Sequence, residues 1–260
     1  MAHSPYTLPL GVAAALPDSD HANTYLAVVR GGRYWLVDCA DGPIGRLQRA
    51  GLDPLNVQGV ILTHFHPDHV YGLPAYVLGL FLLALEVDDH VWTRPVPIYA
   101  RPEVLERVRA LLALFADQEW FNTLPLTYHE VAPEVGARVA EDDDFVITAA
   151  PGEHSVPSLA LRFAARGLDR TFVYSSDTQL SAVVETLASG ADLLFHEATG
   201  SGQGHTSAMA AGELAARAGV AQLGLIHYDP RVAPETLLAP VRRAFEGPVF
   251  LAQELRRYPW

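Results

Sequence analysis

The chain has 260 residues, half of them hydrophobic, so it can bury a sizeable core and is not intrinsically disordered. Its 18 Lys and Arg residues against 30 Asp and Glu residues give a formal net charge of −12, which argues against a broad nucleic-acid-binding face, because such faces neutralise phosphates with cations. The single cysteine, Cys39, excludes an intramolecular disulfide framework and a site of several thiolates, and it fits the reducing cytoplasm in which we expect the protein to reside.

The N-terminal part has the pattern of strands joined by tight turns. Residues 24–29 and 34–38 carry β-branched and aromatic side chains on either side of a Gly-Gly pair, which is typical of a hairpin. A short helix closed by glycine is expected over 43–51. The apolar residues 57–62 predict a buried strand.

Residues 70–87 form an apolar stretch of 18 residues with one charge, Glu86. A membrane span is one interpretation. Because Pro74 and two glycines interrupt the stretch, a buried helix or a helix at an oligomer interface is favoured, and we expect no membrane association. The start, Met1–Pro5, lacks a basic region followed by an apolar core, so we also expect no signal peptide.

The rest of the chain alternates strand and helix patterns. Strands are expected over 96–99, 126–131, 145–150, 158–163, 171–174, 192–195, 222–226 and 249–251. Helices are expected over 102–115, 182–188, 208–218 and 234–245. This order predicts an α/β fold with two sheets covered by helices instead of one doubly wound sheet. Because no linker or repeat divides the chain, we expect residues 1–260 to form a single domain.

Polar residues of ligand type follow several of the apolar strands. Three imidazoles and a carboxylate follow the strand at 57–62, and they belong to His64, His66, Asp68 and His69. Burial of such groups without partners costs several kcal/mol, whereas a loop that turns sharply after a strand can direct all four at a pair of cations. A His-rich surface turn is the alternative interpretation. Four later strands are followed by Glu153-His154, Ser175–Asp177, His196-Glu197 and His227-Tyr228.

Taken in this order, these residues resemble the metallo-β-lactamase-fold hydrolases. The His-x-His-x-Asp-His motif of that family corresponds to His64, His66, Asp68 and His69, and its later His, bridging Asp and C-terminal His correspond to His154, Asp177 and His227. The match runs from about Asn23 to beyond His227. The resemblance implies a four-layer αββα sandwich of two mixed sheets flanked by helices.

The resemblance also implies two divalent metal ions. His64, His66 and His154 would hold one ion, Asp68, His69 and His227 the other, and Asp177 would bridge both. Ligands of imidazole and carboxylate without thiolate suit zinc, with manganese or iron as alternatives. Two metals about 3.5–4 Å apart can share a hydroxide whose pKa falls towards roughly 7, and Asp68 would orient or deprotonate the attacking water.

Residues 196–199 and 204–208 resemble the phosphodiesterase branch of the family, which includes ribonuclease Z and the arylsulfatase-like and cyclic-phosphodiesterase proteins. In that branch a Glu and a His form a pair near the leaving group, so the resemblance implies His205 as general acid and Glu197 as its partner. The alternative is that Thr206 or Ser207 only caps the helix over 208–218, and both roles are compatible.

Members of this branch that cut tRNA carry a basic, glycine-rich arm after the His that corresponds to His154. Here only 22 residues separate His154 from Asp177, which is too few for such an arm and makes nucleic acid an unexpected substrate. The leading hypothesis is a binuclear metal-dependent hydrolase of phosphodiesters, such as a small or cyclic nucleotide-like ester. The alternatives are a tRNA 3′-processing endonuclease, a lactone, thioester or sulfate-ester hydrolase on the same metal site, and a redox module that performs no hydrolysis. Redox relatives typically substitute a ligand, and none is substituted here.

The remaining aromatic and histidine residues are given structural roles. Between His69 and His154 the sequence places Trp92, Trp120, Phe121 and Tyr128, which we expect in the core or at an interface more than over the substrate. Surface positions are expected for His3, His90 and His129, and also for His21, for which a position at the mouth of the site is the alternative. Cys39 is expected to be a small buried residue. The apolar helix at 78–85 is compatible with a homodimer.

Overall fold

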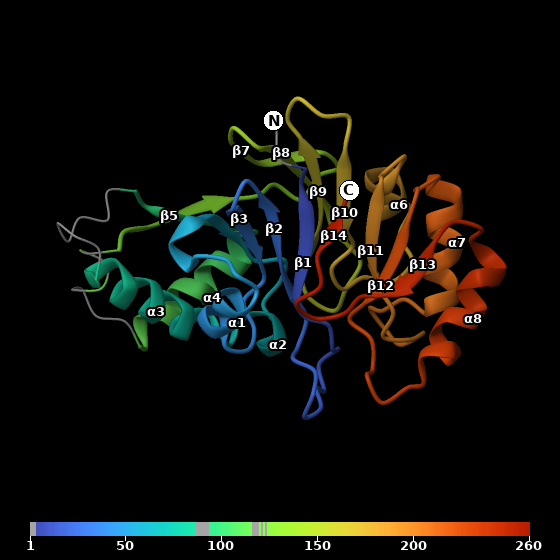
Figure 1. Cartoon of the computed structure of the whole chain (residues 1–260), viewed down its shortest axis with the longest axis horizontal. Helices are drawn as coiled ribbons and strands as arrows, with labels where there is room; N and C mark the ends of the chain where they lie inside the picture. The colour runs from blue at the N-terminus through green and yellow to red at the C-terminus, as the bar shows by residue number, and fades with distance from the viewer. Residues whose placement is uncertain (1–3, 87–93, 116–119, 121, 123) are drawn as a thin grey trace.

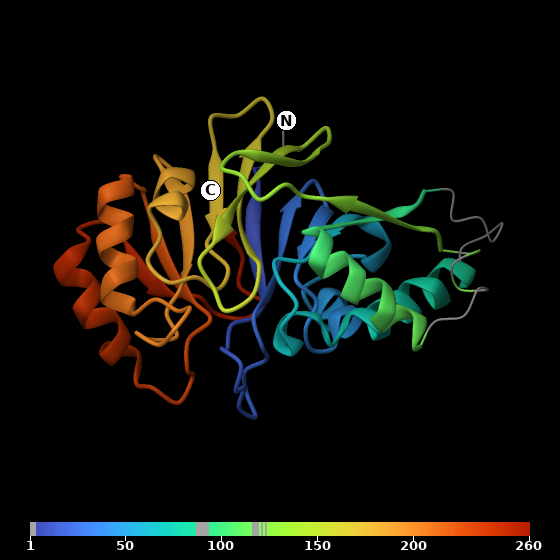
Figure 2. The same ribbon diagram turned by 180° about the vertical axis from the view of Figure 1, so that it is seen from behind.

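The computed structural model describes residues 4–86, 94–115, 120, 122 and 124–260, and two seven-stranded sheets packed face to face form its centre (Figure 1). The first sheet has the order β14-β1-β2-β3-β4-β5-β6 and the second has the order β13-β12-β11-β10-β9-β8-β7. Helices α1 to α4 cover the outer face of the first sheet, and α6 to α8 cover that of the second (Figures 1 and 2). The expected αββα sandwich is confirmed.

The strands of the first sheet are β1 (Tyr6–Gly11), β2 (Tyr25–Arg30), β3 (Arg33–Val37), β4 (Val57–Ile61), β5 (Val96–Ala100), β6 (Leu126–Glu130) and β14 (Tyr258–Pro259). Those of the second are β7 (Ala137–Glu141), β8 (Phe145–Gly152), β9 (Ser158–Ala165), β10 (Thr171–Tyr174), β11 (Leu193–Glu197), β12 (Leu223–Ile226) and β13 (Val249–Leu251). The helices are α1 (Pro43–Arg49), α2 (Pro67–Val70), α3 (Leu73–Glu86), α4 (Pro102–Ala113), α6 (Ala182–Ala188), α7 (Ala208–Ala218) and α8 (Pro234–Ala244).

Each sheet is mixed. In the first, β14 to β3 pair antiparallel and β3 to β6 pair parallel. In the second, β7 to β10 pair antiparallel and β10 to β13 pair parallel. Strands β8 and β10 are both antiparallel to β9, so β8, β10, β11 and β12 end at the same edge of the sheet. The loops that follow these strands therefore lie close together.

Both faces of the central strands are buried, which explains their almost uninterrupted apolar sequences. On β2, Leu26 and Val28 point between the sheets, while Tyr25 and Ala27 point towards the helices of the first layer. The C-terminal Trp260 extends the inter-sheet core by stacking on Phe172, with ring centroids 5.9 Å apart. The rigid sandwich holds the strand-end loops in place.

The apolar stretch at 70–87 becomes two helices in its described part. Gly72 separates α2 from α3 where the chain passes so close to Ala40 that an added Cβ would lie 1.6 Å from the Ala40 oxygen. One face of α3 is buried on the first sheet through residues at helical spacing, such as Leu73, Val77 and Leu80. By length and composition the segment Pro67–Glu86 could cross a membrane, but half of its most apolar window is buried, which favours a core helix.

Most expected elements are present, with ends shifted by a few residues. Strands β1, β7 and β14 and helix α2 were not predicted. In β1, Pro9 and a bulge interrupt the alternation of apolar and polar residues. Strand β14 has two residues and helix α2 has four, which is too short for a recognisable hydrophobic periodicity. Trp120 and Tyr128 pack against the core of the first layer as expected, and Cys39 is buried. The expectations for Trp92, Phe121, His3 and His90 lie outside the described residues.

Candidate metal centre

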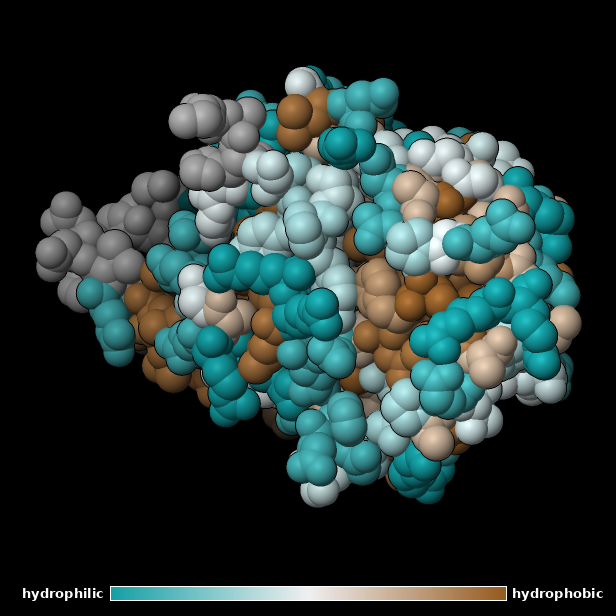
Figure 3. Space-filling view, turned by 45° about the vertical axis from the view of Figure 1, so that its right-hand side comes forward, coloured by the Kyte–Doolittle hydropathy of each residue, from teal (hydrophilic) through white to brown (hydrophobic). Residues whose placement is uncertain are grey.

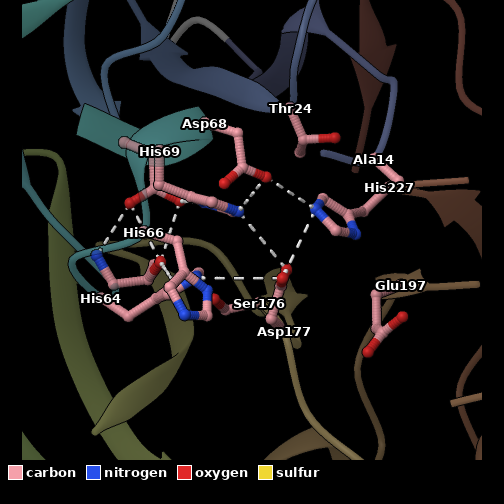
Figure 4. Close-up of polar contacts among 12 residues, drawn as sticks. Ala14, Thr24, His64, His66, Asp68, His69, Ser176, Asp177, Glu197 and His227 are labelled. Atoms are coloured by element: carbon pink, nitrogen blue, oxygen red, sulfur yellow. Dashed lines mark hydrogen bonds and ion pairs between the residues drawn. The ribbon is translucent and has the colours of Figure 1, made fainter. Parts of the chain in front are cut away.

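Seven imidazole and carboxylate side chains converge at the edge where the strands end (Figure 4). One group consists of His64, His66, His154 and Asp177, and the other consists of Asp68, His69 and His227. Within each group the ligand atoms lie within 4.8 Å of one another. The structure thus brings together all seven residues that the sequence motif singled out, in the two groups that the family resemblance implies.

Three loops that surround the cluster begin with unusual backbone geometry. Asp38, Ser176 and His227 have φ angles of 60°, 51° and 51°, in the left-handed region that residues other than glycine rarely adopt. All three follow the ends of buried strands, namely β3, β10 and β12. Such strain persists only where the surroundings fix it, and it is typical of functional sites.

Asp38 orients His69 from behind. Its Oδ2 lies 2.8 Å from His69 Nδ1, and both side chains are fully buried. The backbone N–H and the hydroxyl of Thr63 also donate to this carboxylate. Because a carboxylate only accepts, His69 Nδ1 carries the proton and His69 Nε2 presents a lone pair to the centre.

The other three buried imidazoles are oriented in the same way. Gly204 O accepts from His154 Nδ1 at 2.7 Å. Thr199 donates its hydroxyl to the His227 carbonyl and so accepts from His227 Nδ1, at 2.8 Å. Thr63 likewise donates to Asp38, so its oxygen accepts from His64 Nδ1 at 3.1 Å. In each case the hydrogen-bond partner leaves the Nε2 lone pair facing inward, the tautomer that a metal requires.

Several inward-facing atoms have no hydrogen-bond partner. Among the described residues, His69 Nε2, His227 Nε2 and Asp177 Oδ1 are buried without one. His227 Nε2 lies 3.4 Å from Asp177 Oδ2, and His69 Nε2 lies 3.6 Å from Asp177 Oδ1. Two atoms each about 2.1 Å from a tetrahedral cation are about 3.4 Å apart. The spacing fits atoms that share a divalent cation.

The electrostatics of the cluster also fit a site for divalent cations. Burial and the neighbouring imidazoles keep the pKa values of His64 and His66 below the usual histidine value, so both offer neutral nitrogens. Burial opposes protonation of His69, but the carboxylates of Asp177 and Asp38 outweigh it and raise its pKa. Burial likewise opposes ionisation of Asp177, but His227 and His69 outweigh it and hold its pKa low. The carboxylates of Asp38 and Asp177 thus favour positive charge at this position, which a divalent cation supplies.

A carboxylate–imidazole pair lies beside the cluster. Glu197 is fully buried, and its Oε1 accepts from His205 Nδ1 at 2.9 Å. The backbone N–H groups of Thr178, Thr199 and Thr206 also donate to the Glu197 carboxylate. The hydrogen bond to Glu197 raises the pKa of His205 against the opposing effect of burial. A ring nitrogen of His205 lies within 4.8 Å of ligand atoms of Asp177 and His227, so its proton is available at the centre.

The capping interpretation of this segment also holds. Ser207 is the N-cap of α7 and accepts from Ala210 N at 3.3 Å. His196, which precedes Glu197, is buried away from the cluster, and its Nδ1 lies 2.9 Å from Glu197 O. Sequence reasoning missed Asp38 and Thr199. Asp38 follows an apolar strand as Asp177 does, a signal that could have identified it, whereas nothing local marks Thr199.

Comparisons with known proteins agree with this geometry. Residues 33–228 match the family model described as the beta-lactamase superfamily domain. The ribonuclease Z of Methanothermobacter thermautotrophicus is 28% identical over 291 positions, covering 91% of each chain. The metallo-β-lactamase fold protein YhfI from Bacillus subtilis has a TM-score of 0.85 at 21% identity, covering 99% of this chain and 100% of that one. A diphosphatase from the PhnP family has a TM-score of 0.75 at 16% identity, covering 98% of each.

The family match, the ribonuclease Z relatives and the His/Asp cluster together identify a metal-dependent hydrolase of the metallo-β-lactamase fold. The chain belongs to the beta-lactamase superfamily, and its relatives are ribonuclease Z-like. The cluster fits divalent metal ions.

Proposed function

We propose that this chain is a binuclear, zinc-dependent phosphodiesterase that acts on small or cyclic nucleotide-like esters. The observation that carries the proposal is the pair of His205 and Glu197 beside the seven-residue cluster. Cleavage of a phosphodiester with an alkoxide leaving group requires a proton donor at the departing oxygen, and an imidazole held by a buried carboxylate is suited to that role. Hydrolysis of a lactone or thioester depends less on such a donor.

In this proposal His64, His66 and His154 hold one ion, and Asp68, His69 and His227 hold the second, with Asp177 between them. Two divalent cations bound there would activate a water molecule and polarise the phosphoryl group. Asp68 is partly exposed, and its Oδ2 lies 3.6 Å from both His69 Nε2 and His227 Nε2. This position allows Asp68 to accept a hydrogen bond from the attacking water and orient it.

His205 acts as the general acid. Its Nδ1 proton is held by Glu197, which fixes the ring so that the opposite nitrogen can deliver a proton to the leaving oxygen. Its side chain is 22% exposed, so the acid can be reprotonated from solvent between turnovers. Glu197 is a positioning residue that also favours the protonated imidazole.

A small substrate is favoured over tRNA, the main alternative. The residues between His154 and Asp177 are largely taken up by β9, β10 and their short connection, so this segment belongs to the second sheet and leaves no room for a long inserted arm. The alignment with the ribonuclease Z of M. thermautotrophicus runs over 291 positions, more than this chain has residues, so that relative contains segments missing here. The sequence contains no lysine, and the net charge is −12. Polyanionic RNA would therefore meet few cations.

We also propose that the protein is a homodimer, with α3 and the end of α4 at the interface. Leu82 is 50% exposed, Leu114 79% and Phe115 62%. An apolar groove of about 490 Å³ lies between the two helices, bordered by residues that include Pro74, Leu78 and Leu111. Figure 3 shows hydrophobic side chains at this end of the molecule. Stable dimers bury about 800 Å² per partner, which a surface formed by two helices can supply.

The test of function combines metal content with a substrate panel. Elemental analysis of freshly purified protein should give two divalent ions per chain, or the protein should acquire them on loading with zinc or manganese. The loaded enzyme is then assayed with bis-p-nitrophenyl phosphate, a lactone, a thioester, a sulfate ester and a tRNA precursor. We expect turnover of the phosphodiester to exceed that of the other small esters. Failure to load metal, or preferential cleavage of a lactone, thioester, sulfate ester or tRNA precursor, would overturn the proposal.

A further inference from the structure

A small hollow lies beside the loops that carry the candidate metal ligands. Its volume is about 50 Å³, and it is lined by Phe65, Glu103, Val104, Arg107, Val156 and Pro157. Phe65 lies between His64 and His66 in the chain, and Val156 follows His154 by two residues. Helix α4 forms the opposite wall. The hollow is thus bordered by two of the loops that position the catalytic centre.

Arg107 provides the positively charged side chain in the lining of this hollow. It follows Val104 by three residues on α4. It therefore lies next to the buried face of the helix, to which Val104 and Val108 belong. Its guanidinium carbon lies 5.7 Å from the centre of the Phe65 ring. A guanidinium that rests on an aromatic ring is held in place, while its N–H groups at the edge remain able to donate.

No carboxylate neutralises Arg107 among the residues that the structure describes. Glu103, one helical turn earlier, lies 3.2 Å from the guanidinium of Arg101 instead. Arg231, in the loop after His227, is bonded through two nitrogens to Asp229. The Arg107 guanidinium lies beside the catalytic loops and has no acidic partner in the described part of the chain, in a protein whose net charge is −12. It is therefore available to bind an anionic group of the substrate.

We infer that Arg107 binds a second phosphate of the substrate, next to the scissile phosphodiester. The inference rests on the proposed phosphodiesterase function and narrows its substrate class to nucleotide esters that carry a further phosphate. The size of the hollow admits a compact group of phosphate dimensions and not a base ring. Phe65, Val104 and Pro157 form the apolar side of the hollow, and the Arg107 guanidinium can donate a charge-assisted hydrogen bond to a phosphate oxygen there.

The experiment compares two substrates with the same scissile bond. One is the p-nitrophenyl ester of thymidine 5′-monophosphate, and the other is the same ester with a 3′-phosphate. We expect the metal-loaded wild-type enzyme to prefer the 3′-phosphorylated ester. Arg107→Ala should reduce that preference about three- to tenfold through a higher KM for the phosphorylated ester, with kcat unchanged. Arg107→Lys should retain part of it, because the charge remains and the stacking is lost.

Arg109→Ala is the matched control. Arg109 is on the same helix and stacks on Tyr128 at 4.3 Å, away from the catalytic loops, so its loss should leave the preference unchanged. Equal loss of kcat/KM for both esters in Arg107→Ala, or a wild-type enzyme indifferent to the 3′-phosphate, would refute the inference while the phosphodiesterase proposal stands. Failure of the wild-type enzyme to cleave either ester would instead refute the phosphodiesterase proposal.

Discussion

The carboxylate of Asp38 lies 2.8 Å from Nδ1 of His69, with both side chains shielded from solvent, so the orientation of one inward-facing imidazole depends on a residue that does not itself reach the centre. Asp38→Asn keeps the shape of the side chain and tolerates the left-handed backbone, but removes the charge. We expect metal affinity to fall about 10- to 100-fold, as is usual when such partners are lost. Titration calorimetry with zinc measures this, and Asp53→Asn, at the start of a distant 3₁₀ turn, serves as the control.

Asp177 lies between the two groups of ligand atoms, so its loss should affect both ions. We expect Asp177→Ala to purify with fewer than two metal ions per chain and to resist loading. Elemental analysis after zinc loading provides the measurement. Asp143→Ala, whose side chain is 91% exposed, should bind metal as the wild type does. Two tightly bound ions in Asp177→Ala would contradict a bridging position.

His205→Ala separates proton delivery from metal binding. We expect this variant to keep its metal content and to lose turnover most with poor leaving groups, because p-nitrophenolate departs without a proton and an alkoxide does not. A plot of log kcat against leaving-group pKa should become steeper than for the wild type. An equal loss for good and poor leaving groups would argue against the acid role.

Glu197→Gln tests the pH dependence. The hydrogen bond to Glu197 raises the pKa of His205, and the acid is competent only while protonated. Turnover of a poor leaving group should therefore fall as the pH rises through that raised pKa. Replacement of the carboxylate by an amide lowers the pKa, so the alkaline limb of the profile should move to lower pH. Glu185→Gln, at a surface ion pair with Arg217, is the control and should leave the alkaline limb in place. An alkaline limb that does not move in Glu197→Gln would show that Glu197 does not set the pKa of the general acid.

The proposed homodimer is tested by a substitution on the exposed apolar face of α3. Leu82→Glu places a charge in the middle of the exposed face of α3, and we expect it to convert the dimer to a monomer in analytical ultracentrifugation. Met209→Glu changes a side chain of comparable exposure, 46%, on α7 in the other half of the molecule, and it should sediment as the wild type does. A wild-type protein that is monomeric at all concentrations would contradict the proposal.

Local patterns explain which parts of the fold could be predicted. Strands such as β10 and helices such as α7 have apolar runs or helical spacing bounded by turn residues, so their ends could be assigned from sequence. Strand β1 could not, because Pro9 breaks its pattern and its pairing with β14 joins the two ends of the chain. Pairing at that distance leaves no local signal.

The same distinction applies to the site. The ligand-type residues at strand ends were found because each follows an apolar run. Thr199 was not found, since its role depends on contact with His227, 28 residues away. The contact between Phe65 and Arg107 likewise joins a loop to a helix 42 residues later, and only the folded chain brings them together.

One short loop carries Gly204, whose carbonyl orients the ring of His154, and the next residue, His205, whose imidazole is the proposed general acid. The φ angle of Gly204 is 81°, and a Cβ there would lie 2.8 Å from His154 Nδ1. Substitutions that move this loop to suit a different leaving group would thus also disturb the orientation of His154 and weaken metal binding. We therefore expect homologues that act on a different substrate to keep the conformation of this loop. Their sequences should differ instead at the residues around the site, including those of α4.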